Sequence, residues 1–251
     1  MAELREKSGL PLKLEGNKLV FGKPLKQVKA EARTLEQMKP VLLEPNAKAS
    51  QELYFMYRNV CLEKHRKKIE ENGLRYDLTV IPPATIGKEF IKTMGHFHPN
   101  VPSTSVAFPE VYEVLHGAAH YLLQKKDGSD AVVLKAVTGE KALIPPSYGH
   151  ITINAGKETL VMSNWVSMSF SSEYGAIKEK HGGMYFETVN GWVKNNNYSS
   201  VPKLREVKAK NVEIFGLIKN KPMYFLAEEI EKLEFLNKPQ NYLEVFEKYL
   251  K

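Results

Sequence analysis

The sequence predicts an all-β core with a short N-terminal helix and a C-terminal helical extension. From Tyr76 to about Tyr185, short runs of β-branched and aromatic residues alternate with turn signals, which is typical of an antiparallel barrel or sandwich. Nearer the C-terminus, apolar residues instead recur at helical spacing. We therefore expect strands and a helix packing on the barrel over residues 1–50, the barrel itself over 51–190, and a mainly helical extension over 191–251.

Two local signals stand at the N-terminus. The stretch Leu12–Phe21 predicts a hairpin with Gly16-Asn17 at its turn. Thr34 and Gln37 form a capping-box pattern, which predicts that a short helix begins there.

The next two segments differ in character. Leu53–Val60 is strand-like, and its alternation places Tyr54 and Met56 on one face. Residues 62–73 are dense in charge and predict either a solvated loop or a short helix ended by Gly73.

Turns then divide the central region into short strands, and two apolar patterns follow them. The turn signals are Pro82-Pro83, Lys126–Gly128, Gly139, Pro145-Pro146 and Asn154–Gly156. The patterns Leu226–Leu236 and Tyr242–Leu250 predict helices separated by Pro239, with Asn241 as a cap for the second. Each has one apolar face, so these helices must cover the barrel, pack on each other or meet another subunit.

Composition limits the class of protein. The 251 residues are 43% hydrophobic and 26% charged, which suits one large globular domain. The chain has no apolar run near the roughly eighteen residues of a membrane span, and its start lacks a signal-peptide pattern. Cys61 is the only cysteine, so no intrachain disulfide is possible and a cytoplasmic location is favoured. The net charge of +7 could indicate a nucleic-acid partner, but the lysines are spread along the chain and no recognition motif accompanies them. An anionic small substrate or a lysine-rich proteome explains the charge equally well.

The most informative pattern is a set of candidate metal ligands. His96 and His98 are two apart, so on an extended strand both imidazoles point to one face. Glu110 and His150 on neighbouring strands would complete a site of three nitrogens and one oxygen, which suits iron, manganese, nickel or zinc. The alternative is that these are ordinary surface or core residues. Four residues that match spaced motifs in order favour the metal site.

Other residues compete for these roles and are less favoured. Glu113 is the rival carboxylate, but it lies out of register with Gly117. His116 stands at a strand end beside a turn, where exposure is expected rather than ligation. The remaining histidines have no matched spacing, and we expect ordinary roles for them: His65, His120 and His181.

Both halves of this ligand pattern resemble the cupin motifs. Glu110 is followed after six residues by Gly117, and Pro145-Pro146-Ser147-Tyr148-Gly149-His150 is followed by Asn154. The resemblance implies a cupin barrel, that is, a double-stranded β-helix or jelly roll. Two departures are visible. Ser147 replaces the usual glycine, and eleven residues separate His98 from Glu110, a long spacer that must loop out before the next strand.

Longer phrases make the resemblance more specific. Over Leu19–Phe186 the chain resembles the cupin-type glucose-6-phosphate isomerases known chiefly from archaea. The phrases that carry it are Gly87–Phe90, Thr93–His98, Pro109–Gly117, Leu122–Gln124 and Ile144–Asn154.

The resemblance implies interconversion of glucose 6-phosphate and fructose 6-phosphate, a step of glycolysis and gluconeogenesis. It implies one divalent metal ion per subunit, foremost Fe²⁺, with Mn²⁺, Ni²⁺ or Zn²⁺ as alternatives, held by His96, His98, Glu110 and His150. It places Thr79, Thr93 and Gly95 at the phosphate, with Tyr54 nearby, and it places Tyr112 and Tyr174 around the metal and substrate. Ser172 stands where the family has a histidine, which removes the family's candidate for histidine-assisted ring opening.

Each of these polar residues also has an ordinary explanation. The two threonines suit any β-sheet, Tyr54 could be a core residue, and Tyr174 lies in a polar stretch where plain exposure is expected as often. Tyr112 is two residues from Glu110 on the same face, where it would bind a sugar hydroxyl or orient the carboxylate.

In such a site the metal binds the C1 and C2 oxygens, and two mechanisms are open: an enediolate with Glu110 as proton carrier, or a direct hydride shift. Two other functions use the same scaffold, a metal-dependent dioxygenase and a non-catalytic sugar-phosphate-binding or storage cupin. A homodimer is expected by family analogy and symmetry. No nucleic-acid or membrane partner is expected, and activity on mannose 6-phosphate is left open.

Overall fold

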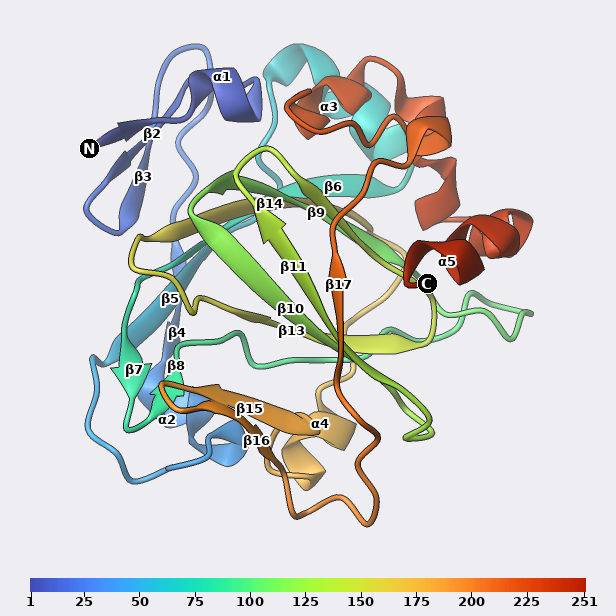
Figure 1. The fold of residues 1–251 in the computed structure, drawn as a ribbon. Coiled ribbons are helices and arrows are strands. Elements are labelled where there is room, and N and C mark those ends of the chain that lie inside the picture. Colours follow the sequence, from blue (N-terminus) through green and yellow to red (C-terminus); the bar gives the residue numbers. More distant parts are fainter.

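The computed structural model describes residues 1–251 and has two large sheets at its centre (Figure 1). One is six-stranded in the order β12-β9-β14-β6-β5-β4, and the other is four-stranded in the order β13-β10-β11-β17. Neighbouring strands are antiparallel, except that β17 runs parallel to β11. The bounds of the first sheet are β4 Glu31–Thr34, β5 Glu52–Tyr57, β6 Leu74–Ile81, β9 Glu110–His116, β12 Lys141–Ile144 and β14 Leu160–Ser167. Those of the second are β10 Ala118–Lys125, β11 Ala131–Val137, β13 Tyr148–Ile153 and β17 Arg205–Lys208.

Side chains of the two sheets meet between them, as the predicted barrel requires. The rings of Tyr112 on β9 and Tyr121 on β10 pack with their centroids 5.3 Å apart. One hydrophobic cluster extends from Leu4 to Leu250, so the barrel and both flanking segments share a core. The all-β core of the predicted cupin barrel is confirmed. The boundaries 1–50, 51–190 and 191–251 stay predictions as domain limits.

Smaller elements surround the barrel. A three-stranded sheet holds β1 Ala2–Glu3, β2 Leu12–Glu15 and β3 Lys18–Phe21, and a four-stranded one holds β7 Thr85–Ile86, β8 Glu89–Phe90, β15 Tyr185–Thr188 and β16 Gly191–Lys194. The short helices are α1 Arg5–Ser8, α2 Leu35–Met38, η1 Lys39–Val41, α3 Glu63–Glu71 and α4 Gly175–Glu179.

Three predictions about the N-terminal half are confirmed. The hairpin turns at Gly16, where φ is +59°, and pairs Glu15 with Lys18. The capping box forms at α2: the Thr34 hydroxyl accepts a hydrogen bond from the Gln37 amide, and the Gln37 side chain accepts one from the Thr34 amide. The charged stretch after residue 62 is a helix rather than a loop.

The predicted helices of the C-terminal extension form, with corrections. Most of the helical residues are 3₁₀: η2 Glu213–Phe215, η3 Met223–Ala227, η4 Ile230–Leu236 and η5 Pro239–Tyr242, followed by α5 Leu243–Tyr249. Asn241, the predicted cap of the second helix, lies within η5 instead, and Tyr242 is the N-cap of α5. Before these, Arg205–Lys208 forms β17 at the edge of the barrel sheet. This strand has one apolar residue among charged ones, so its sequence gives no alternation to recognise.

The extension packs both on the barrel and on itself. The Trp165 indole on β14 donates to the Met223 carbonyl over 3.1 Å. The Tyr249 hydroxyl accepts a 3.1 Å hydrogen bond from the Leu143 amide on β12. Within the extension, Phe215 and Phe235 stack with their centroids 4.0 Å apart. None of the helices is long and apolar enough to cross a membrane.

The register of the six-stranded sheet places polar residues on one inner face. Asn164 on β14 stands opposite both Asp77 on β6 and Tyr112 on β9. Successive side chains of a strand alternate between faces, so residues two apart in each strand join this face. It contains Tyr54 and Met56 of β5, Arg75 and Thr79 of β6, Met162 and Val166 of β14, and Glu110 of β9.

Glu113 faces the opposite way. It is buried, its carboxylate lies 2.8 Å from the Lys141 ammonium, and it accepts a 2.8 Å hydrogen bond from the Met223 amide. Burial raises the pKa of Glu113 to about 7, although Lys141 opposes the shift. This pair anchors the C-terminal extension to the barrel.

Replacing Lys141 with methionine should destabilise the fold by about 3–5 kcal/mol, because Glu113 is then a buried charge without its partner. The double variant Glu113→Leu/Lys141→Met should recover most of that loss. Because the pKa of Glu113 is raised in the folded state, the destabilisation of Lys141→Met should grow as pH rises through about 7 and shrink in acid. Denaturant unfolding at pH 5 and pH 8 measures both effects. A double variant no more stable than Lys141→Met would contradict this account.

Candidate metal and substrate site

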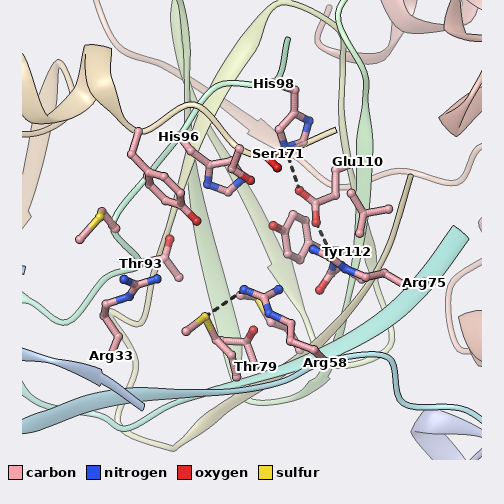
Figure 2. A pocket seen from close by; sticks show the side chains of 18 of the residues that line it. Arg33, Arg58, Arg75, Thr79, Thr93, His96, His98, Glu110, Tyr112 and Ser171 are labelled. Atoms are coloured by element: carbon pink, nitrogen blue, oxygen red, sulfur yellow. Dashed lines mark hydrogen bonds and ion pairs between the residues drawn. The ribbon is translucent and has the colours of Figure 1, made fainter. Parts of the chain in front are cut away.

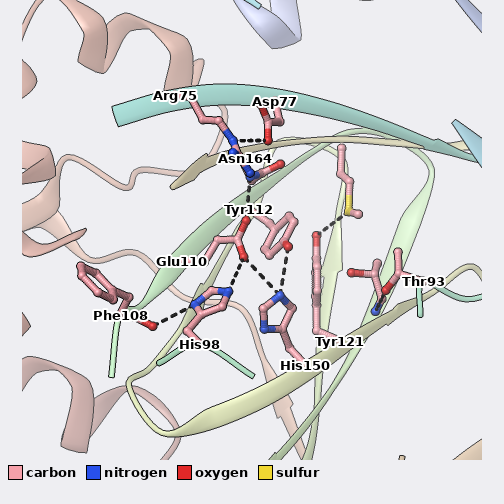
Figure 3. Close-up of polar contacts among 12 residues, drawn as sticks. Arg75, Asp77, Thr93, His98, Phe108, Glu110, Tyr112, Tyr121, His150 and Asn164 are labelled. Carbon is pink, nitrogen blue, oxygen red and sulfur yellow. Dashed lines mark hydrogen bonds and ion pairs between the residues drawn. The ribbon is translucent and has the colours of Figure 1, made fainter. Parts of the chain in front are cut away.

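The four predicted metal ligands lie together. One ligand atom from each of His96, His98, Glu110 and His150 lies within 4.8 Å of the others. Glu110 begins β9 and His150 lies in β13, and Figure 3 shows both with His98. His96 and His98 belong to an extended segment that is bridged to β13 at His96. Two backbone hydrogen bonds between His96 and His150, of 3.3 and 3.0 Å, fix the relative position of these two residues.

Hydrogen bonding assigns the protons of the His98 imidazole. Its Nδ1 lies 2.9 Å from the Phe108 carbonyl, which can only accept, so Nδ1 carries the proton. Its Nε2 therefore presents a lone pair to Glu110 Oε2, 3.4 Å away. The Nε2 of His150 lies 3.2 Å from the same oxygen, and the buried Nδ1 of His150 has no hydrogen-bond partner. Two imidazole nitrogens that converge on one carboxylate oxygen in this way fit a cation, and three imidazoles with a carboxylate are a donor set for a divalent metal.

The surroundings keep these groups in the forms that bind metal. Burial lowers the pKa of His96 well below its ordinary value, and the neighbouring His150 and His98 lower it further. Burial alone would raise the pKa of Glu110, but the neighbouring His150 and His98 outweigh it and bring that pKa well below its usual range. The cluster therefore offers a neutral His96 imidazole and an ionised carboxylate.

Two further side chains hold the cluster in place. Asn164 Nδ2 donates to Glu110 Oε1 over 2.6 Å, which leaves Oε2 directed at the imidazoles. The Tyr112 hydroxyl lies 3.1 Å from His150 Nε2. Burial, together with Glu110, raises the pKa of Tyr112 well above its ordinary value, so the hydroxyl keeps its proton.

A cavity of about 310 Å³ opens beside the cluster and contains the other predicted site residues (Figure 2). This volume is at the lower end of the range for small-molecule sites. Tyr112 and all five residues predicted at the substrate line it: Tyr54, Thr79, Thr93, Gly95 and Tyr174. Ser172 lines it as well, and the Tyr174 ring lies 5.4 Å from the His96 ring, centroid to centroid.

Three of these residues have donors available to a ligand. Thr93 Oγ1 accepts from the Thr152 amide, and the Tyr54 hydroxyl accepts from the Met94 amide, so both hydroxyl protons stay free. The Gly95 amide makes no hydrogen bond within the chain. Only glycine suits this position, because φ is +79° and a Cβ atom would lie 2.5 Å from Ile151 Cγ1.

Sequence reasoning missed the polar residues that complete the cavity: Arg33, Arg58, Arg75, Asn164 and the buried Asp77 behind them. Asp77 Oδ2 lies 2.8 Å from both Arg58 Nη1 and Arg75 Nε. A signal existed for two of them. Arg75 shares the strand parity of Thr79, and Arg58 follows Tyr54 and Met56 at intervals of two.

The other histidines take ordinary roles. His65 Nδ1 lies 3.0 Å from the Tyr224 hydroxyl, and His120 Nδ1 lies 2.8 Å from Glu187. His116 is half-buried rather than exposed, since its Nδ1 bonds the Thr159 carbonyl at 2.8 Å. None of these belongs to the metal cluster.

Comparison with known proteins agrees with this geometry. The family model described as Glucose-6-phosphate isomerase (GPI) matches residues 32–203. The chain belongs to this family. The predicted family is thereby confirmed, and with it the prediction of an isomerase that acts on sugar phosphates.

Curated relatives show how far the likeness extends. The glucose-6-phosphate isomerase of Pyrococcus furiosus is 32% identical over 139 residues, which are 55% of this chain and 69% of the relative. The glucose-6-phosphate isomerase of Thermococcus kodakarensis is 29% identical over 180 residues, which are 71% of this chain and 87% of the relative. Among solved structures, Bacillus subtilis oxalate decarboxylase aligns with 52% of this chain and 30% of its own at 20% identity and a TM-score of 0.36, too loosely for a functional argument.

Glu110 and Glu113 point to opposite faces of β9, and only Glu110 belongs to the histidine cluster, so their replacement should affect metal binding differently. Glu110→Gln should lower the affinity for a divalent metal roughly 100-fold or more. Even replacing a residue that only hydrogen-bonds a metal ligand lowers metal affinity about 10–100-fold, and Glu110 is a proposed ligand itself. Glu113→Gln makes the same chemical change on the opposite face and should leave metal binding unaltered. Elemental analysis after gel filtration, with titration of Mn²⁺ into stripped protein, measures both. Equal metal content in the two variants would refute the assignment.

Proposed function

We propose that the chain interconverts glucose 6-phosphate and fructose 6-phosphate in this cavity, with a divalent metal held by His96, His98, Glu110 and His150. One observation carries the proposal: in a member of this family, four metal-binding groups lie within 4.8 Å of one another, and three of them stand in the wall of a cavity that also presents free hydroxyl and amide donors. Fe²⁺ is the foremost candidate, and Mn²⁺, Ni²⁺ and Zn²⁺ suit the same ligands.

The donors of the cavity suit the phosphate end of the substrate. The hydroxyls of Thr79, Thr93 and Tyr54 and the amide of Gly95 are proposed to bind phosphate oxygens. Glycine lets an oxygen approach the backbone closely, and hydroxyls donate without bringing bulk. Holding this end fixes the carbon chain with its C1 and C2 atoms toward the histidine cluster.

The reacting end of the sugar would lie beside Glu110. A bound divalent ion supplies Lewis-acid polarisation of the C1 and C2 oxygens. Glu110 is proposed to take the proton from one of these carbons and return it to the other. Asn164 suits this task, because its bond to Oε1 holds the carboxylate in one orientation throughout.

The tyrosines are proposed to position the sugar. The neutral Tyr112 hydroxyl, next to His150, would bind a sugar hydroxyl or hold the imidazole in place. Tyr174 would form a wall of the cavity beside His96. The homodimer and the cytoplasmic location stay predictions.

Activity after removal of metal tests the proposal. Protein stripped with a chelator should lose conversion of glucose 6-phosphate, and resupply of one metal at a time should restore it, foremost with Fe²⁺. Glu110→Gln should stay inactive after resupply, whereas Glu113→Gln, assayed where thermal unfolding shows it to be folded, should keep the activity of the unmodified protein. A coupled assay in both directions measures this. Full activity in protein shown to be metal-free, or no conversion with any of the four metals, would overturn the proposal.

A separate measurement tests Glu110 as the proton carrier. When fructose 6-phosphate is converted in D₂O, solvent deuterium should appear at C2 of the glucose 6-phosphate formed, as read by NMR or mass spectrometry. Long incubation over many turnovers lets even a shielded carboxylate exchange its proton. Complete absence of deuterium after such an incubation would rule out proton transfer through Glu110 and favour the hydride shift.

A further inference from the structure

Arg33 differs from the other two arginines of the cavity in having no counter-charge. Arg58 and Arg75 share the carboxylate of Asp77, each over 2.8 Å. Arg33 forms no ion pair, and its buried Nε atom has no hydrogen-bond partner. A buried polar group without a partner is costly, so native proteins rarely leave one unless a ligand satisfies it.

The guanidinium of Arg33 stands on the side of the cavity that holds two of the proposed phosphate donors, Tyr54 and Thr93. Arg33 on β4 pairs in register with Tyr54 on β5. Burial raises the pKa of Tyr54, and the Arg33 charge beside the hydroxyl opposes that shift. In Figure 2, Arg33 and Thr93 lie on one side of the cavity, whereas Arg58 and Arg75 lie on the other.

The fold holds this arginine in position before any ligand arrives. The capping box of α2 begins at Thr34, the residue directly after Arg33, and fixes the backbone there. On the other side, strand pairing with Tyr54 fixes the register. A guanidinium held in place loses little freedom on binding, and its planar donors match two oxygens of a phosphate.

We propose that Arg33 binds the substrate phosphate and makes the cavity select phosphorylated sugars over neutral ones. The identity of the sugar rests on the proposed isomerase function, but binding of the phosphate by Arg33 does not require turnover. Neutral donors discriminate less between a sugar hydroxyl and a phosphate than a cation does. The guanidinium of Arg33 has no counter-charge in the chain, so it binds a phosphate dianion more tightly than a neutral sugar hydroxyl.

Binding of a substrate analogue that cannot isomerise tests the proposal. Glucitol 6-phosphate and glucitol differ only in the phosphate, and neither has the carbonyl group that isomerisation needs. In calorimetry on the metal-loaded protein, Arg33→Gln should weaken binding of glucitol 6-phosphate by about 10- to 100-fold, because a hydrogen bond to a charged group contributes about 1.5–3 kcal/mol. Binding of glucitol should not change. Arg33→Lys keeps the positive charge but not the planar set of donors. Its affinity for glucitol 6-phosphate should lie between those of the unmodified protein and Arg33→Gln.

Matched controls separate this role from a structural one. Arg66→Gln removes an arginine of α3 outside the cavity and should leave both affinities unchanged. Thermal unfolding monitors the fold, and Arg33→Lys should keep it intact. An Arg33→Gln protein that is folded and binds glucitol 6-phosphate as tightly as the unmodified protein would overturn the proposal. An equal loss of affinity for glucitol and for glucitol 6-phosphate in Arg33→Gln would also overturn it. The same holds if the unmodified protein binds neither compound.

The two proposals fail in different ways. If the unmodified protein binds glucitol 6-phosphate through Arg33 but does not convert glucose 6-phosphate, the isomerase function fails and the role of Arg33 stands. If the protein isomerises and Arg33→Gln leaves the KM for glucose 6-phosphate unchanged, the role of Arg33 fails and the isomerase stands. With both correct, Arg33→Gln should raise that KM by about 10- to 100-fold, in line with the loss in binding.

Discussion

Three imidazoles and a carboxylate converge within 4.8 Å of one another, with His96 half-buried and the other three residues buried, and the rest of the site is arranged around this constraint. A proton fixed on His98 Nδ1 leaves Nε2 only as an acceptor, 3.4 Å from Glu110 Oε2. Such an arrangement is unfavourable in a low-dielectric interior unless a cation lies among the ligands. Asn164 strengthens the constraint, because it occupies the other carboxylate oxygen and directs Oε2 at the imidazoles. The barrel supplies the stiffness, since each ligand is attached to a paired backbone segment.

Strand β9 shows how alternation assigns two tasks to one short segment. Glu110 on the inner face has a pKa well below its ordinary value, because it interacts with His150 and His98. Glu113 on the outer face has a pKa of about 7, because burial outweighs its pairing with Lys141. The first is suited to binding a cation and the second to attaching the C-terminal extension. The same residue type therefore serves chemistry on one face and packing on the other, and a shift of register by one residue would exchange them.

The sequence was most informative where function needs fixed spacing. The interval between His96 and His98 and the motif ending at His150 pointed to residues that the fold brings together, and the Thr34–Gln37 pattern identified a helix start. Residues that act through tertiary contact were missed. Asn164 lies in β14, which is buried on both faces, so its polar side chain has no alternating pattern around it. The strand at Arg205–Lys208 exists because it pairs at the edge of β11, and the 3₁₀ geometry of the extension depends on packing against the barrel.

The proposed site depends on one cation bound by three nitrogens and one carboxylate oxygen of the chain. X-ray absorption at the metal edge of the loaded protein reports these ligands. We expect three imidazole nitrogens and one carboxylate oxygen, with any remaining ligands from solvent, and loss of the carboxylate in Glu110→Gln but not in Glu113→Gln. A first shell with fewer than three imidazoles, or one that Glu110→Gln leaves unaltered, would contradict it.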